Sequence, residues 1–389
     1  MDLSSCRLCE KNIINNPLLT LEGMPKSAQH FLDYEELPSR ENITLNIYQC
    51  DNCGLVQLNL EPVSYYKDVI TAASISKDAR KSRLKQMTDF ANRFNLQNKK
   101  IIEIGCAKGD MLDIIEDAGM KAYGLEHSAE SVLFAKNKKR KVIKGFIDDL
   151  DEIEFGPFSG FICFNFLEHL PDPKSVIKKI YNNLEDDGVG LVTVPNLNYL
   201  LETKSFYEFV ADHLSYFTID TLKNAFYDAN FDVLECKLIN NENDILIIIK
   251  KNQKKNQKKI NDIKKVIIQN DYKEVEKLIY NLKNLIKDYK RKKMKVAIWG
   301  AGHRTLALLA LSKIKDIEYI VDSAKFKQGK YSPVMNTKIV SPETLTKDKI
   351  DLLIIMVPGI YPDEVIKNVK SMSIDIKLAK LNDNKIEFI

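Results

Sequence analysis

The stretch IIEIGCAKGDML, residues 101–112, decides the fold of the central part of this 389-residue chain. An apolar run ends at Glu103 and Gly105, a turn follows as far as Gly109, and helix-forming residues begin at Asp110. Glycines in such a turn let the backbone approach a ligand, and they bring the N-terminus of the next helix beside it. The pattern predicts a strand, a ligand-binding loop and a helix.

A second apolar run, MKAYGLE at residues 120–126, ends in an acid that suits the same ligand. Glu126 lies about 23 residues after Glu103, and a carboxylate there can accept hydrogen bonds from both hydroxyls of a ribose. A dinucleotide site favours the fingerprint G-x-G-x-x-G, whereas this loop reads E-x-G-C-x-K-G. The loop and the acid together indicate a nucleoside-containing cofactor. A Rossmann domain of another kind is the alternative.

Strand-like apolar runs alternate with helix-length segments between about residues 80 and 250. This alternation predicts an α/β domain with a parallel sheet. A second α/β unit begins at KVAIWGAGHR, residues 295–304. The strand-like runs of the first unit are KKIIEIGC (99–106), MKAYGLE (120–126), FSGFICFNF (158–166), VGLVTVPN (189–196) and DILIIIKK (244–251).

The segment between the two units, residues 251–294, is rich in lysine and has apolar residues at helical spacing. We expect one or two amphipathic connecting helices whose lysines form a solvated face and do not bind nucleic acid. We therefore divide the chain into a cysteine-containing module (1–78), a central domain (79–250), a helical connector (251–294) and a C-terminal Rossmann-like domain (295–389).

Four of the seven cysteines form two C-x-x-C pairs near the N-terminus: Cys6 with Cys9, and Cys50 with Cys53. Each pair can place two thiolates on one tight turn, and two such turns complete a tetrahedral zinc site. Four thiolates leave no open position on the metal, so the predicted zinc is structural. Disulfides and a redox C-x-x-C are the competing interpretations.

Composition narrows the class of protein further. The net charge of +4 is small for this length, and much of the basic excess lies in one segment. No nucleic-acid partner is therefore expected. The N-terminus lacks the pattern of a signal peptide, and the longest apolar runs are too short to span a bilayer. We expect a soluble cytoplasmic protein without a membrane partner.

The loop at 103–109 resembles motif I of the class I S-adenosylmethionine (SAM) methyltransferases, whose cofactor has no phosphate. NFLEHLPDP, residues 165–173, resembles their segment after the fourth strand. The order of motifs along the whole chain resembles the three-domain, zinc-containing sugar C-methyltransferases of the tetronitrose and mycarose branches. The remaining matches are CDNCGLVQL (50–58), the pair Tyr65-Tyr66, VPN (194–196), DHLSYFT (212–218) and VAIWGAGHR (296–304).

This resemblance implies methylation of the carbon beside a ketone in a nucleotide-linked keto-deoxysugar, for a surface polysaccharide or a secondary metabolite. It implies that the C-terminal domain helps to hold the nucleotide. It also assigns residues to the site. For SAM these are Glu103, Gly105, Ala107, Gly109, Glu126 and Asn165; for catalysis they are His213, His169, Asp212, Tyr66 and Tyr216.

The segment EFVADHLSYF, residues 208–217, departs from the pattern of that family, which reads Tyr-x-Glu-His-Leu-x-Tyr-Phe. Val210 replaces the tyrosine and Asp212 the glutamate, while His213 is kept. Val210 cannot donate a hydrogen bond to a substrate oxygen, so Tyr216 or Tyr66 would have to do so. On a helix, Tyr216 and His213 would share a face.

His213 is the expected general base, because a neutral imidazole suits proton abstraction near neutral pH. His169 is its rival, and a packed, inert His213 is the alternative. The runner-up function is O- or N-methylation on the same architecture, with His213 or His169 deprotonating a hydroxyl or an amine. A binding protein that has lost its chemistry is the non-enzyme alternative.

The C-terminal unit carries part of a nicotinamide fingerprint. Gly300 and Gly302 follow a strand-like run, and IEYIVDSA ends the next run at Asp322. Thr305 and Leu306 occupy the region of the third glycine, so the fingerprint is incomplete. We expect this unit to hold part of a nucleotide-linked substrate; a purely structural module and a second cofactor site are the alternatives.

Overall fold

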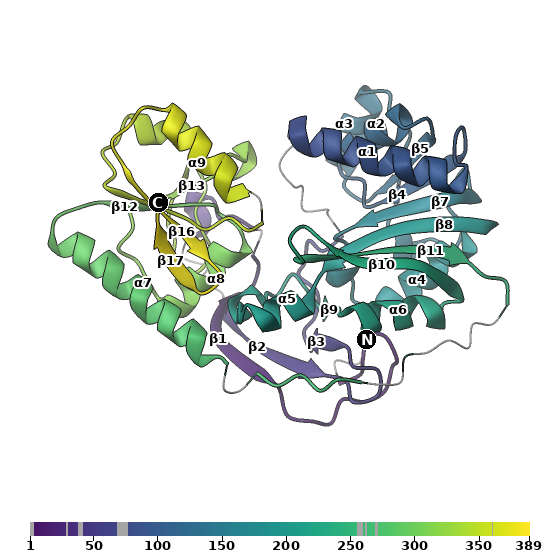
Figure 1. Ribbon diagram of the computed structural model, residues 1–389, viewed down its shortest axis with the longest axis horizontal. Coiled ribbons are helices and arrows are strands. Elements are labelled where there is room, and N and C mark those ends of the chain that lie inside the picture. Colours follow the sequence, from purple (N-terminus) through teal and green to yellow (C-terminus); the bar gives the residue numbers. More distant parts are fainter. Residues whose placement is uncertain are drawn as a thin grey trace.

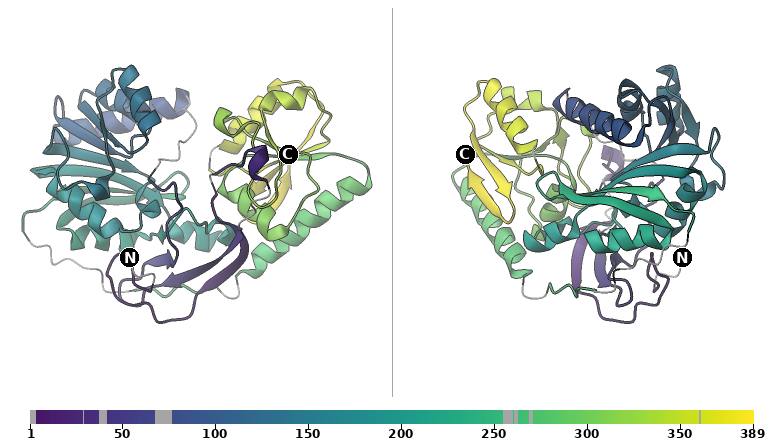
Figure 2. Two further views of the ribbon diagram at one scale, coloured as in Figure 1. Left: turned by 180° about the vertical axis from the view of Figure 1, so that it is seen from behind. Right: turned by 45° about the vertical axis from the view of Figure 1, so that its right-hand side comes forward.

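The computed structural model of the chain describes residues 4–28, 30–37, 42–67, 77–254, 260, 263–268, 271–359 and 361–389. Within these ranges the named strands form sheets of four, seven and six strands. Two α/β units stand on either side of a smaller N-terminal sheet, so that the molecule has an open V shape (Figures 1 and 2). Part of the predicted connector, 251–294, lies outside the described residues.

The seven-stranded sheet forms the central unit, in the order β10-β11-β8-β7-β4-β5-β6. Its core strands pair in parallel, as predicted. The run at 244–251, however, lies antiparallel to both of its neighbours. The strands are β4 (Lys100–Ile104), β5 (Lys121–Glu126), β6 (Val142–Lys144), β7 (Phe158–Phe164), β8 (Leu184–Pro195), β10 (Phe231–Ile239) and β11 (Asp244–Lys251).

Helices cover both faces of this sheet, which explains its unbroken apolar runs. Residues 101–104 of β4 are all buried, because a covered parallel strand has no wet side on which polar residues alternate. One face carries α1, α2 and α3, and the other carries α4 and α6 (Figure 1). These helices are α1 (Lys77–Phe94), α2 (Asp110–Asp117), α3 (Ala129–Asn137), α4 (Pro173–Asn182) and α6 (Ile219–Asp228); the short α5 (Leu197–Glu202) precedes α6.

The N-terminal sheet includes a strand from the middle of the chain. Its order is β1-β2-β3-β9, with β1 (Leu19–Pro25), β2 (Asn42–Gln49), β3 (Val56–Leu58) and β9 (Ser215–Tyr216). Tyr216 is paired with Val56, so the segment that follows His213 is extended. The helical face that we considered for His213 and Tyr216 is therefore wrong, because sheet pairing sets the backbone here.

The C-terminal sheet has the order β14-β13-β12-β15-β16-β17, and only its edge strand β17 pairs antiparallel. Among the described residues of the connector, one helix forms; residues 263–268 are not helical, contrary to the two-helix option. The strands are β12 (Val296–Trp299), β13 (Ile320–Val321), β14 (Ile339–Val340), β15 (Leu352–Ile355), β16 (Lys377–Asn382) and β17 (Lys385–Phe388). The helices are α7 (Lys273–Arg291), α8 (His303–Ser312) and α9 (Tyr361–Ser371).

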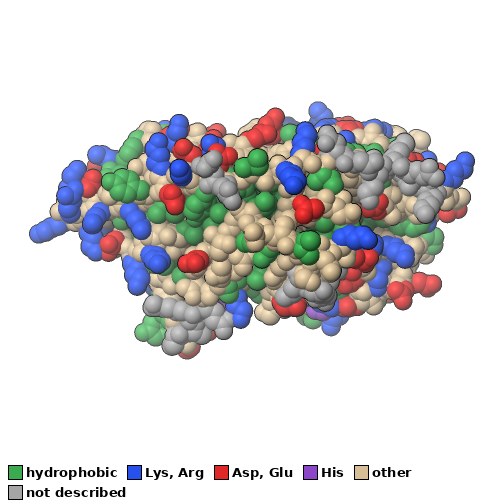
Figure 3. Space-filling model, turned by 90° about the horizontal axis from the view of Figure 1, so that it is seen from below, with side chains coloured by type: hydrophobic (Ala, Val, Ile, Leu, Met, Phe, Trp, Pro, Cys, Tyr) green, Lys and Arg blue, Asp and Glu red, His purple; other side chains and the backbone are tan. Residues whose placement is uncertain are grey.

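The amphipathic pattern predicted for the connector is confirmed in α7. Val275, Leu278, Leu282 and Ile286 are buried, whereas the lysines between them are exposed. Figure 3 shows basic side chains gathered over the end of the molecule that carries α7 in Figure 1. A helix of this kind gains its stability by burying one apolar stripe against a neighbour.

A shared apolar core joins the N-terminal sheet to the C-terminal unit. Leu45 and Ile47 of β2, Phe209, Leu308 of α8 and Ile354 of β15 belong to one buried cluster. Each is fully buried, so separating the two parts would expose a large apolar area to water. This core fixes the position of the C-terminal unit and hence of the cavity described next.

Candidate functional site

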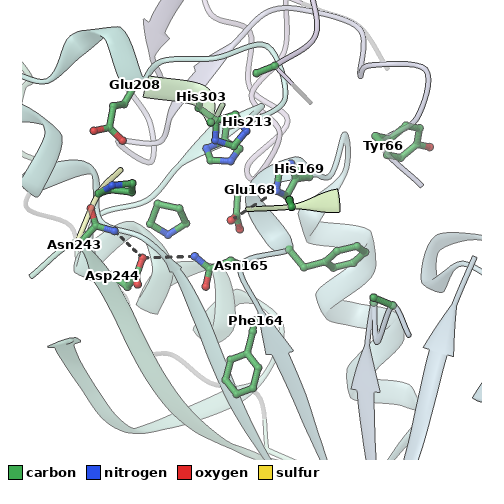
Figure 4. A pocket seen from close by; sticks show the side chains of 18 of the residues that line it. Tyr66, Phe164, Asn165, Glu168, His169, Glu208, His213, Asn243, Asp244 and His303 are labelled. Carbon is green, nitrogen blue, oxygen red and sulfur yellow. Dashed lines mark hydrogen bonds and ion pairs between the residues drawn. The ribbon is translucent and has the colours of Figure 1, made fainter. Parts of the chain in front are cut away.

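A cavity of about 580 Å³ lies between the central and C-terminal units. The loop after β4, the segments after β7 and before β9, and the loops after β12 and β13 all contribute lining residues (Figure 4). Eight of the predicted site residues line it: Glu103, Gly105, Ala107, Asn165, His169, His213, Tyr66 and Tyr216. Gly109, Glu126 and Asp212 do not.

The glycine loop has the backbone that its sequence predicts. Gly105 and Gly109 have φ angles of 72° and 82°, in the left-handed region that favours glycine. A Cβ on Gly109 would lie 2.9 Å from Cδ of Arg140, so the site also lacks room for a side chain. Ala107 has a φ of 47° and is the strained member of the loop. Helix α2 begins directly after Gly109, with its N-terminus beside the cavity.

Glu126 lies behind this loop and anchors it. Its carboxylate accepts hydrogen bonds from the backbone N–H of Ala107 (2.8 Å) and of Ser128 (2.7 Å), and the residue is 1% exposed. A carboxylate has about four lone-pair sites and could accept further bonds from a ribose, but Glu126 does not line the cavity. The role of Glu126 as a ribose ligand therefore stays a prediction.

The floor of the cavity is an amide–carboxylate network, part of which Figure 4 shows. The Asn165 side chain accepts from the Thr193 hydroxyl (2.6 Å) and donates to Asp244 (3.5 Å). Asp244 also accepts from Asn240 (2.6 Å) and Asn243 (3.2 Å). Asp244 opens β11, so the antiparallel strand supplies a carboxylate that our sequence interpretation missed.

Two further carboxyls are buried in the lining without a hydrogen-bond partner for one oxygen among the described residues. They are Oε2 of Glu103 and Oε2 of Glu168. Burial, together with nearby Glu126, raises the pKa of Glu103 to about 8. Burial also raises the pKa of Glu168 to about 8; a backbone hydrogen bond within the residue lowers this pKa, and the nearby Asp244 raises it. Glu168 lies within a quoted motif, yet the sequence alone assigned it no role.

Three histidines from three segments meet at the cavity. The His213 ring lies 4.7 Å from that of His169 and 5.2 Å from that of His303, centroid to centroid. Burial lowers the pKa of His169 and of His303 to about 4, and it lowers that of His213 well below its usual value. All three are therefore neutral near pH 7. His303, the first residue of α8, was missed because no local pattern places it beside His213.

His169 is oriented by the backbone of the neighbouring segment. Its Nδ1 lies 2.7 Å from the carbonyl oxygen of Asp212, an acceptor, so Nδ1 carries the proton. Asp212 accepts from the Ala28 N–H and the Tyr65 hydroxyl, each at 2.7 Å. The Asp212 carboxylate thus joins the N-terminal module to the site. Asp212 contacts the His169 imidazole through its backbone carbonyl and not through its carboxylate.

The two candidate tyrosines differ in their freedom to act. The Tyr216 hydroxyl accepts from the backbone N–H of Val210 (2.9 Å) and donates to the Val210 carbonyl (3.2 Å). These bonds use its only proton, so it is not poised to donate to a substrate. Tyr66 lines the cavity at its other side, away from the histidines (Figure 4).

The C-terminal loops are held by their own contacts. Asp322 accepts from the N–H groups of Ala301 and Ala324, each at 2.8 Å, and from Lys327 at 3.1 Å. Arg304 pairs with Glu208, which links α8 to the segment before His213. Asp322 thus holds the loop after β12 in the way that Glu126 holds the loop after β4, and the expectation that no nicotinamide cofactor binds here stays a prediction.

The four N-terminal cysteines converge as their spacing predicts. Sγ of Cys6 lies 3.4 Å from that of Cys53, and Sγ of Cys9 lies 3.5 Å from that of Cys50. These separations exceed a disulfide bond of about 2.05 Å, and all seven cysteines are free. The four sulfurs form a group able to hold a metal ion.

Comparison with known proteins identifies the chemistry of the chain. Residues 78–236 match the model of a methyltransferase domain, and residues 243–375 match a C-methyltransferase C-terminal domain. The C-methyltransferase NovU of Streptomyces niveus is 22% identical over 399 aligned positions, which cover 95% of this chain and 92% of that protein. A ubiquinone biosynthesis O-methyltransferase of Glaesserella parasuis is 25% identical, over 29% of this chain and 52% of its own length.

Among solved structures, a SAM-dependent methyltransferase from Clostridium acetobutylicum aligns with 44% of this chain and 92% of its own, at 14% identity and a TM-score of 0.39. The matched domains and the seven-stranded sheet make the chain a SAM-dependent methyltransferase of the class I α/β fold. No helix in the described ranges has the length and apolarity needed to cross a membrane.

Proposed function

We propose that this methyltransferase adds a methyl group to the carbon beside the ketone of a nucleotide-linked keto-deoxysugar. The cavity between the two α/β units carries the proposal. One wall is the glycine loop of the methyltransferase domain, and the other belongs to the C-terminal unit. The match of that unit to a C-methyltransferase domain and the likeness to NovU over nearly the whole chain support transfer to carbon.

The residues on the glycine-loop side fit SAM. The loop from Gly105 to Gly109, with Glu126 behind it and Asn165 on the floor, would hold the nucleoside and the amino-acid tail. The Asp244 carboxylate suits the positive charges of that tail and of the sulfonium. A cation bound beside Glu103 would favour loss of the proton that burial otherwise keeps on that carboxyl. When bound, SAM supplies an electrophilic methyl group.

The opposite wall suits a phosphate-bearing substrate. Helix α8 begins at His303 with its N-terminus at the cavity, and Lys327 lines the same wall. A helix N-terminus and a lysine both attract phosphate. This arrangement would place the sugar between the two units, beside His213.

His213 is the proposed proton acceptor. It is neutral and buried, and it lies at the centre of the three rings. His169 keeps Nε2 available because Nδ1 contacts the Asp212 carbonyl, so it is the second candidate. Removing a general base costs about 10²–10⁴-fold in rate. We therefore expect His213→Asn to lose turnover while SAM still binds, and a selective loss in His169→Asn would move the base to that residue.

The cysteine cluster is proposed to bind one structural zinc ion. Tetrahedral thiolate sites with a zinc–sulfur distance of about 2.3 Å place the sulfurs a little under 4 Å apart. The Cys6–Cys53 and Cys9–Cys50 pairs, at 3.4 and 3.5 Å, are near that spacing. The alternative chemistry, a redox pair, would instead need a βαβ setting, which the short strands here do not supply.

O-methylation is the second candidate function. Val210 stands where the resembled family has a tyrosine, so one donor to a ketone oxygen is missing from that segment. An attacking hydroxyl would need only a base, and the histidines could serve it.

A matched pair of substrates separates the two. The full chain is incubated with carbon-13-methyl SAM and nucleoside diphosphate sugars bearing a 4-ketone, or with the same sugars reduced to the 4-hydroxyl. We expect a labelled product only from the keto sugars, detected by mass spectrometry. Methylation of the reduced sugars alone would favour O-methylation, and no methylated sugar from either set would overturn the proposed substrate class.

A further inference from the structure

Removing a proton beside a ketone leaves negative charge on the ketone oxygen, and that charge needs a hydrogen-bond donor. We propose that Glu168 is this donor, acting as a neutral carboxylic acid. The inference rests on the proposed function and adds a catalytic residue to it. Neither Val210 nor Tyr216 can fill the role, because the first is apolar and the hydroxyl of the second is bonded to the Val210 backbone.

The position of Glu168 is set by its backbone. It lies in η3 (Leu167–His169), the short turn that follows β7, and its carbonyl accepts from the N–H of Leu214 at 2.7 Å. That bond joins the turn to the segment carrying His213. The carboxyl is 2% exposed and lines the cavity, as Figure 4 shows. Its Oε2 is buried and has no partner among the described residues, so the carboxyl keeps an unused hydrogen-bonding group at the cavity wall.

The Glu168 carboxyl and the two imidazoles lie close enough to contact the C–H and the ketone oxygen of one substrate. A carboxyl oxygen of Glu168 and nitrogens of His169 and His213 all lie within 4.8 Å of one another. An H–C–C=O unit placed between them can give its proton to the imidazole and accept a hydrogen bond from the carboxyl, each at about 2.6–3.2 Å. His169 Nε2 lies 3.9 Å from Glu168 Oε1, which is longer than a hydrogen bond, so this imidazole and the carboxyl do not bond directly.

The surroundings keep the carboxyl protonated. The titratable groups that face it are His169, His213, Asp244, Cys163 and Tyr216. The histidines are neutral, the thiol and the phenol are buried and neutral, and Asp244 opposes a second negative charge. A buried carboxyl without a cationic partner retains its proton and can donate it in a hydrogen bond.

The electrons balance in this scheme. The C–H proton moves to His213, the C–H electrons form the carbon–carbon double bond, and the ketone oxygen takes the charge under the Glu168 O–H. The electrons of the carbon–carbon double bond then form the bond from carbon to the methyl group. The methyl–sulfur bond breaks, its electrons stay on sulfur, and the ketone re-forms. Glu168 keeps its proton throughout, and the histidine loses its proton to water after release of the products.

Two variants test the chemistry. Glu168→Gln keeps an N–H donor of the same shape, whereas Glu168→Ala removes it. The probe is a thymidine diphosphate 4-keto-6-deoxyhexose with SAM. Removing one oxyanion donor costs about 10²–10³ in kcat, and we expect that loss in Glu168→Ala but at most a tenfold loss in Glu168→Gln. Wild-type activity should fall as the pH rises through about 8, where the carboxyl loses its proton. This decline should be absent in Glu168→Gln.

A readout without substrate separates this inference from the proposed function. The infrared spectrum of the wild type minus that of Glu168→Gln should contain the band of a protonated carboxyl at pH 7, shifted in heavy water. Absence of that band overturns the inference, whether or not the probe is a substrate. Failure of the proposed function is seen separately, as a lack of turnover of the probe by the wild type. Equal loss of activity in Glu168→Ala and Glu168→Gln would also overturn the inference. So would the binding of one divalent cation by Glu168, His169 and His213 that is lost in Glu168→Gln.

Discussion

The ion pair between Arg304 and Glu208 should stabilise the contact between the two α/β units. The Arg304 side chain is 8% exposed and that of Glu208 is 19% exposed. Nε and one terminal nitrogen of Arg304 both donate to the same carboxylate oxygen. Glu208→Ala would leave a buried guanidinium without its partner. Breaking a buried pair in this way costs about 3–5 kcal/mol, and the partial exposure of Glu208 places the expected cost near the lower end.

The single tryptophan makes this cost measurable. Trp299 ends β12 and is 3% exposed, so its fluorescence reports on unfolding of the C-terminal unit. With a urea dependence of about 1–3 kcal/mol per molar, a loss of about 3 kcal/mol lowers the midpoint by about 1–3 M. The control is Asp316→Ala, which breaks the exposed pair with Lys290 and should cost less than about 1 kcal/mol.

The double variant Glu208→Met, Arg304→Met provides the sharper check. Replacing both charges with apolar side chains removes the unpaired charge, so much of the stability lost in Glu208→Ala should return. A midpoint for Glu208→Ala equal to that of Asp316→Ala would show that the Arg304–Glu208 pair does not stabilise this contact. So would a double variant that is less stable than Glu208→Ala.

Three further predictions concern ligands. Purified protein should contain one zinc ion per chain, and Cys50→Ser with Cys53→Ser should lose both the metal and the fold of the N-terminal module; zinc retained in that variant contradicts the site. Glu126→Ala should weaken SAM binding at least tenfold by calorimetry, because each hydrogen bond to a charged group contributes about 1.5–3 kcal/mol; unchanged affinity would remove Glu126 from the cofactor site. The full chain should not bind NAD or NADP tightly, because Thr305 and Leu306 occupy the region of the third glycine of the fingerprint; micromolar binding measured by fluorescence would reverse this interpretation.

The central fold and the cysteine cluster were the most predictable features, because both follow from local sequence. Gly105 and Gly109 need left-handed backbone, and an apolar run before them predicts β4. The four cysteines come together because two short turns suffice to place them. In each case the residues that decide the structure lie close together in the chain.

The features that the sequence did not predict depend on contacts between distant segments of the chain. Strand β9 has two residues and exists because it pairs with Val56, so the sequence around His213 gave no sign of it. The Glu126 carboxylate accepts a hydrogen bond from the backbone N–H of Ala107, and the apolar pattern of β5 gives no information about this contact. His303 reaches His213 only because α8 packs beside β1 and the segment at Phe209.

The position of the transferred methyl group in the product decides whether the enzyme methylates carbon or oxygen. The keto-sugar nucleotide is incubated with the full chain and carbon-13-methyl SAM, and the product is examined by long-range proton–carbon correlation in NMR. We expect a methyl group bonded to the carbon next to the ketone, formed together with an equal amount of S-adenosylhomocysteine. A methyl group on an oxygen of the sugar, or S-adenosylhomocysteine formed without any methylated sugar, would contradict it.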